Sequence, residues 1–160
     1  MDINKSVREH VLSVLRGGHA HVRPEEVLLR FPEKLRGKKV RGAPHTAWEL
    51  LEHMRITQHD ILDFCVNPKY EEMTWPDNYW PSSAEPPSAT AWDESVSAFR
   101  EDRAALEALA DDESIDLFAK IPHGDGQTYI REILLVADHN AYHLGQLVAV
   151  RQQLGAWGTA

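Results

Sequence analysis

Two histidines near the end of the sequence, four residues apart, have a type and a spacing that could carry out chemistry. His139 and His143 lie in a run of residues with high helix propensity. Side chains at positions i and i+4 of a helix share one face, with Cβ atoms about 5–6 Å apart. Both imidazoles can therefore reach one ion, with bonds of about 2.0–2.1 Å if the ion is zinc. A third ligand must come from another part of the chain.

Earlier histidines supply the candidates for that third ligand. His53 lies on the flank of the apolar stripe of a predicted helix, whereas His59 points to the polar side of the same helix. His45 precedes the helix and is the second candidate, because a chain end can bend inward. Three neutral imidazoles would leave positions on the ion open for water or substrate, as in catalytic sites.

The sequence leaves the identity of the ion and of its helpers open. Zinc or nickel suits ligation by nitrogen alone, and manganese, iron and cobalt are further candidates. Glu49, Glu132, Asp138 or Tyr142 could orient a ring or position a water molecule. The alternative without a metal is a pair of hydrogen-bonded core histidines.

Motifs of several other enzyme classes are absent. The three residues between His139 and His143 include no glutamate, so the helix-borne base of common zinc proteases is missing. No glycine-rich phosphate loop, no pair of CxxC motifs and no Gly-x-Ser-x-Gly elbow occur. Peptide hydrolysis and nucleotide use therefore lose support.

The elements that must position these histidines are helices. Apolar periodicity predicts long helices over 4–16, 46–66, from 88 or 90 to 111, and 128–154, with a short helix over 24–29. Thr46 and Glu49 form a capping box at the start of the second long helix. No convincing alternating strand occurs. We predict one all-α domain over residues 1–160, a four-helix bundle with long connections after the first, second and third long helices.

The last predicted helix is apolar on two sides. One side should face the interior of the bundle and the other a second packing surface, such as a partner subunit. Ala137, Ala141 and Gly145, at successive i+4 steps, would allow a close helix approach. The first stripe comprises Ile130, Leu134, Ala137, Ala141, Leu144 and Val148, and the second comprises Glu132, Leu135, Val136, His139, His143 and Val150.

The connection over residues 70–88 is rich in aromatic residues and prolines. It holds Trp75, Tyr79, Trp80 and four prolines, too many helix breakers for a regular element and too much aromatic area for a solvated linker. Such a segment packs on something. It either covers the end of the hydrophobic core or forms a wall beside the histidines.

Composition narrows the partners and the compartment. The 160 residues carry a net charge of -8, which argues against nucleic acid or an anionic membrane as the partner and leaves a small-molecule substrate. Cys65 is the single cysteine and cannot form an intrachain disulfide, which fits a reducing compartment. The N-terminus lacks the apolar region of a signal peptide, and the longest apolar run, 133–137, is far shorter than the roughly 20 residues of a membrane span. We expect a cytoplasmic protein.

Two segments of the chain resemble one known family. The segment LLEHM at 50–54, in the capped helix, and the segment DHNAYHLGQL at 138–147 are similar to the DinB-like (DinB/YfiT) superfamily. The resemblance implies an up-down-down-up bundle, frequently a homodimer, with a divalent metal held by three histidines in a cleft near one end. Carried over position by position, the ligands are His53, His139 and His143.

The resemblance also implies a function. Relatives include thiol-dependent transferases and isomerases that use low-molecular-weight thiols such as bacillithiol or mycothiol, where the metal would lower the pKa of the thiol. The sequence is thus expected to encode a metal-dependent enzyme, a thiol-dependent S-transferase or a hydrolase that acts on small molecules. The alternative is a non-catalytic metal-binding or stress-related dimeric bundle.

Overall fold

The computed structural model describes residues 3–158, so that Met1 and Asp2, part of the N-terminal stretch considered above, lie outside it. The all-α expectation is confirmed. No strand forms within residues 3–158, where one isolated β-bridge joins Lys120 and Thr128. The elements are α1 (Ile3–Arg16), α2 (Pro24–Leu28), η1 (Glu33–Leu35), α3 (Ala47–Val66), η2 (Asp77–Tyr79), α4 (Ala91–Asp111) and α5 (Tyr129–Gln153).

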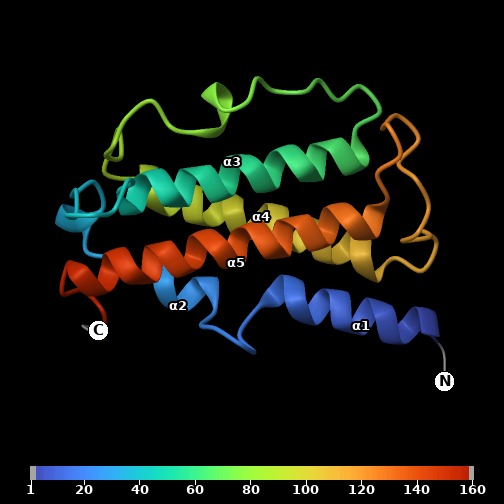
Figure 1. The fold of residues 1–160 in the computed structure, drawn as a ribbon, viewed down its shortest axis with the longest axis horizontal. Coiled ribbons are helices and arrows are strands. Elements are labelled where there is room, and N and C mark those ends of the chain that lie inside the picture. Colours follow the sequence, from blue (N-terminus) through green and yellow to red (C-terminus); the bar gives the residue numbers. More distant parts are fainter. Residues whose placement is uncertain (1–2, 159–160) are drawn as a thin grey trace.

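The four long helices of the described residues, α1, α3, α4 and α5, form the bundle shown in Figure 1. Helix α3 packs against α4 and α5, and α1 packs against the same two helices from the other side. The colours in Figure 1 show that α3 and α4 run in one direction and that α1 and α5 run in the other. No helix in the described part of the chain combines the length and the hydropathy that a bilayer crossing requires.

The parallel course of α3 and α4 explains the long segment between them. A helix of 20 residues such as α3 is about 30 Å long, so the chain must return over that distance before α4 can begin. Figure 1 shows residues 67–90 running back along α3. The sequence therefore passes its aromatic connection over the helix that carries His53.

The helix starts follow the capping signals of the sequence. Both bonds of the capping box are present at α3: the Glu49 N–H donates to Thr46 Oγ1 over 3.2 Å, and the Thr46 N–H donates to the Glu49 carboxylate over 2.7 Å. At α4, Ser88 Oγ accepts from the Ala91 N–H at 3.1 Å, whereas the Thr90 side chain makes no capping bond. Of the two predicted caps of α4, Ser88 is thus the one that acts.

The core consists of two apolar clusters separated by a polar level. The first cluster lies around Met54, Trp92, Phe99 and Leu147, and the second is built largely of aliphatic residues from α1 and from the other halves of α3, α4 and α5. Between the clusters, Asn140 Nδ2 donates to Gln58 Oε1 over 2.9 Å, and Gln58 Nε2 donates to the Phe99 carbonyl over 2.7 Å. We call Thr57, Gln58 and Asn140, all buried, the middle layer.

The two apolar stripes predicted for the last helix are wrong in detail. Leu134 and Leu135 are 42% and 37% exposed. The actual buried stripe falls between the predicted ones because α5 also buries Asn140, which an apolar pattern omits and whose Nδ2 donates to Gln58. No neighbouring element within residues 3–158 comes within 4 Å of the position a Cβ would take at Gly145, so no described helix approaches α5 closely at this glycine. The buried apolar members are Ile133, Val136, Ala137, Leu144, Leu147 and Val150.

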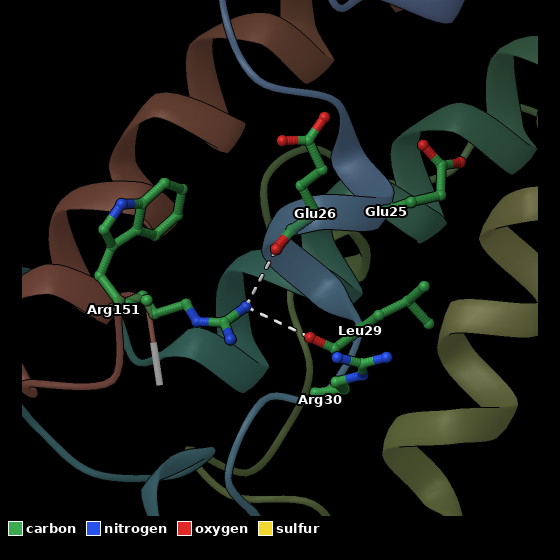
Figure 2. A pocket seen from close by; sticks show the side chains of 7 residues that line it. Glu25, Glu26, Leu29, Arg30 and Arg151 are labelled. Atoms are coloured by element: carbon green, nitrogen blue, oxygen red, sulfur yellow. Dashed lines mark hydrogen bonds between the residues drawn. The ribbon is translucent and has the colours of Figure 1, made fainter. Parts of the chain in front are cut away.

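Arg151 fastens α2 to the C-terminal half of α5. This arginine is 5% exposed, and its Nη1 donates to the carbonyls of Val27 at 2.6 Å and Leu29 at 3.3 Å. Figure 2 shows the guanidinium reaching from α5 to the end of α2, across a hollow of about 470 Å³. Carbonyls at a helix C-terminus carry partial negative charge that offsets the buried cation. The charge of Arg151 is therefore committed to holding α2 against α5.

Candidate metal centre

The structure brings together the three histidines that the sequence selects. His53 lies on α3, and His139 and His143 lie one turn apart on α5. One ring nitrogen from each residue lies within 4.8 Å of the other two, and the Nε2 atoms of His53 and His139 are 3.1 Å apart. The antiparallel course of the two helices produces this convergence, and a hydrogen bond from Asn140, the residue after His139, to Gln58 joins the same two helices.

Hydrogen bonds orient two of the three rings. His53 Nδ1 lies 2.7 Å from the Tyr79 carbonyl, and His143 Nδ1 lies 2.9 Å from Gln146 Oε1. Since both partners are acceptors, each Nδ1 carries the proton and donates it, and each Nε2 keeps its lone pair. Fixing the outer nitrogen in this way is how proteins prepare histidines as ligands.

The aromatic connection forms a wall beside the triad, the second of its two predicted roles. The Trp80 ring stacks on His53 with centroids 3.8 Å apart and planes 4° apart. His45 stacks on Trp80 at 3.9 Å and 17°. Two rings this close to one indole and this nearly parallel to it cannot share one face. Trp80 therefore separates His45 from His53, and His45 lies outside the cluster that His53 forms with His139 and His143.

Burial keeps the triad neutral. Desolvation, reinforced by the neighbouring imidazoles, lowers the pKa of His53 to about 4 and that of His139 to about 4. The pKa of His143 is also lowered, mainly by burial. A charged imidazole has no free lone pair, so lowered values leave all three rings in the form that binds a metal near neutral pH.

Comparison with known protein families identifies the family of this chain. Residues 6–147 match the DinB superfamily, a span that includes all three histidines and most of the chain. The chain belongs to the DinB superfamily. Comparisons with curated proteins and with solved structures gave no significant match.

The donor set of this DinB-superfamily chain fits a divalent transition metal. Two nitrogens bound to one tetrahedral ion with bonds of about 2.0–2.1 Å stand about 3.3 Å apart, close to the 3.1 Å between His53 and His139 Nε2. Three neutral nitrogen donors suit borderline ions such as zinc and nickel. The three-histidine cluster and the family are both compatible with metal binding.

The other candidate residues from the sequence either make other contacts or lie at the surface. Glu49 closes the capping box, and Glu132 is buried with one oxygen paired to Arg131. Tyr142 is 65% exposed, and its ring meets the His143 ring edge-on with centroids 4.8 Å apart. His59 is exposed and pairs with Asp102 at 3.1 Å.

Sequence reasoning missed the two groups that orient the rings. Gln146 follows His143 by three residues, one helical turn, and that spacing was a usable signal. The Tyr79 carbonyl gives no signal, because every residue has a backbone carbonyl and only the path of the connection brings this one to His53.

Proposed function

We propose that this protein is a metal-dependent enzyme in which His53, His139 and His143 bind a divalent ion, zinc or nickel before manganese, iron or cobalt. The observation that carries the proposal is the convergence of three ring nitrogens within 4.8 Å from two helices. The two oriented Nδ1 atoms and the lowered pKa values of the rings support it. Three ligands leave room on the ion for a molecule from solution.

The protein and the bound ion would have different roles in the reaction. A bound divalent ion would lower the pKa of a thiol or water beside it and so supply a nucleophile at neutral pH. The Tyr79 carbonyl and the Gln146 side chain hold two of the rings, and Trp80 covers His53 and keeps water from that side. His139 is only partly buried, so the approach for a small molecule lies on its side of the triad.

A thiol-dependent transferase is the reaction type we favour, with a hydrolase next. Within residues 3–158, no carboxylate forms a hydrogen bond with any of the three rings. The side chains recorded against the triad are aromatic rings and amides, such as Trp80, Gln146 and Asn140. A site without its own carboxylate base suits a thiol cofactor, whose S–H is acidic enough to ionise once a cation is near.

The test combines metal analysis with a thiol assay. The purified protein should carry about one divalent ion per chain and should consume a bacillithiol-, mycothiol- or glutathione-type thiol with an electrophile only when that ion is present. His53→Ala, His139→Ala and His143→Ala should each lose most of the metal and keep their helical content. His59→Ala, on the exposed side of α3, is the matched control. Full metal occupancy in all three triad variants would refute the proposal.

The alternative is a metal-binding bundle without turnover. The burial of the triad favours it, since His53 is 1% exposed and His143 is 8% exposed. Cobalt-loaded protein separates the two, because a thiol that reaches the ion changes its visible absorption spectrum. An unchanged spectrum together with unconsumed thiol across the panel would leave the alternative.

We also propose that the protein acts as a homodimer through the exposed side of α5. Leu134 is 42% exposed and Tyr142 is 65% exposed, so this helix keeps apolar surface outside the bundle. Light scattering should give twice the mass of the chain for the wild-type protein and the mass of one chain for Leu134→Glu. A monomeric wild-type protein would contradict the proposal.

A further inference from the structure

A second cavity lies between α3, α5 and the connections that follow α3 and α4. Its volume is about 470 Å³. Asp60 follows His53 by seven residues and Glu132 precedes His139 by seven, two helical turns that return to nearly the same face and span about 10 Å along the axis. The lining residues are Asp60, Ile61, Phe64, Tyr70, Glu72, Tyr79, His123, Gly124, Asp125, Gln127, Arg131, Glu132 and Leu135.

Tyr79 belongs to both places. Its carbonyl accepts from His53 Nδ1 at 2.7 Å, and its hydroxyl donates to Asp60 at 2.7 Å on the wall of the cavity. Tyr70 donates to the other Asp60 oxygen at 2.9 Å. A molecule in the cavity would therefore lie against the residue that orients a ring of the triad.

The charges that line the cavity favour a cation. Four carboxylates line the cavity. They come from α3, from α5, from the connection between α3 and α4 and from the connection between α4 and α5: Asp60, Glu132, Glu72 and Asp125. They outnumber the one arginine, Arg131, which pairs with Glu132. His123 bonds through Nε2 to the Phe64 carbonyl at 2.7 Å. The field inside such a recess attracts positive charge.

One buried acceptor among the lining residues lacks a donor. Gln127 Oε1 is buried and has no hydrogen-bond partner within residues 3–158. Glu132 is 3% exposed, and one of its carboxylate oxygens accepts from Arg131. A buried acceptor without a donor is unfavourable. A ligand that brings an N–H group would satisfy Gln127 Oε1.

A bare metal ion does not fit these carboxylates. Among the described residues, the His53, His139 and His143 cluster is the group of ligating side chains close enough to hold one ion, and the acidic residues of the cavity form no such group. Their spacing suits a larger organic cation, whose charge is spread over several N–H donors. We propose that this cavity binds the ammonium or guanidinium group of an organic molecule.

The role of that molecule rests on the proposed function. If the triad is catalytic, the bound molecule is its substrate, and its reacting group lies about 10 Å from its cationic group, the distance of two helical turns. The substrate class is then a small amine or guanidine with an extended body. The binding of a cation in the cavity stands without the metal and can be measured on its own.

The experiment is a titration of the metal-free protein, followed by amide NMR shifts, with n-butylammonium, n-butylguanidinium and the neutral n-butanol. Both cations should bind saturably, with shifts concentrated at the cavity, and the tighter of the two identifies the group. Glu132→Gln should weaken cation binding by at least about tenfold, as expected for a lost charged hydrogen bond. Arg131→Gln removes the competing charge and should leave binding as tight or tighter. Binding of n-butanol as tight as that of the cations would overturn the proposal.

Further variants guard this result. Asp125→Asn changes an exposed residue of the rim and should fold normally and weaken binding, so the test does not depend on the buried Glu132 alone. Glu94→Gln, exposed on α4, should change nothing. Unaltered affinity in both Glu132→Gln and Asp125→Asn would also overturn the proposal. Cation binding in a protein that binds no metal would refute the proposed function alone, and metal binding without cation binding would refute this inference alone.

Discussion

The middle of this bundle and the two halves on either side of it are built from different residues. The halves hold apolar side chains with little or no exposure, such as Met54 and Phe99 on one side and Leu106 and Ile133 on the other. The middle holds the buried polar groups of the middle layer and, at the same level, the three histidines. The two apolar halves supply the stability of the fold. The buried polar groups of the middle lower that stability, and in return they position the three histidine rings.

The comparison teaches what the middle layer is for. Apolar surfaces pack in several registers with similar energy, whereas an amide pair buried in a core is satisfied in one register alone. The bond from Asn140 to Gln58 holds α5 at one height along α3, and that height brings His53 level with His139 and His143. We interpret the middle layer as the element that aligns the rings.

The largest effect should come from an apolar half. Phe99 is fully buried, so Phe99→Ala should lower the free energy of unfolding by about 3–5 kcal/mol. Chemical denaturation of the metal-free protein measures it. Phe118→Ala, at a position that is 59% exposed, is the control and should change little. A loss below about 1 kcal/mol at Phe99 would show that the halves do not carry the stability.

The middle layer should respond to substitution in the opposite way. Asn140→Leu leaves Gln58 Oε1 buried without a donor and should lower the free energy of unfolding by about 1–3 kcal/mol. Adding Gln58→Leu removes the unsatisfied group, so the double variant should regain much of that loss. If the layer sets the register, the double variant will still bind metal more weakly than the wild type. A double variant that is no more stable than Asn140→Leu, or that binds metal like the wild type, would contradict this interpretation.

Local signals explain how much of the fold and site the sequence could predict. The start of α3 follows from Thr46 and Glu49, three residues apart, and a helix is determined mostly by its own residues. The selection of His53 over His59 required only the phase of one helix, and the structure agrees: His53 is buried and His59 is exposed. Such features need no knowledge of a second element.

What the sequence could not predict depends on contacts between elements. Asn140 is buried because Gln58, on another helix, meets it, and for that reason an apolar pattern misplaced the buried stripe of α5. The separation of His45 from the triad depends on Trp80, and the support of His53 depends on the Tyr79 carbonyl. Both come from the return path of residues 67–90, which no local pattern specifies.

Acid should lower the free energy of unfolding through the buried histidines of the middle and not through the apolar halves. The pKa of His53 and of His139 is about 4 in the folded protein and 6.5 for an ordinary histidine, and the pKa of the neighbouring His143 is also lowered by burial. Below pH 6.5 the unfolded chain binds protons that the folded chain does not, so the free energy of unfolding is full above pH 6.5 and falls toward pH 4. Denaturation of the metal-free protein at a series of pH values measures this slope.

Two variants test which histidine causes this dependence of stability on pH. His139→Phe removes one titrating ring and should flatten it, whereas His59→Ala, on the exposed side of α3, should leave it unchanged. An equal slope in the wild type and in His139→Phe would show that the buried ring does not account for the acid sensitivity.

The smallest effect should appear in the outer contacts of the triad. Gln146 is half-buried and accepts from His143 Nδ1 at 2.9 Å, so Gln146→Ala frees that ring to rotate without opening the core. Loss of such an outer partner weakens metal binding by roughly 10- to 100-fold, and we expect the lower end because Tyr79 still holds His53. Metal titration with a competing chelator measures the change, with Gln153→Ala, exposed on the same helix, as the control. If Gln146→Ala bound metal as tightly as the wild type, the packing of the middle alone would orient His143 and the hydrogen bond would be incidental.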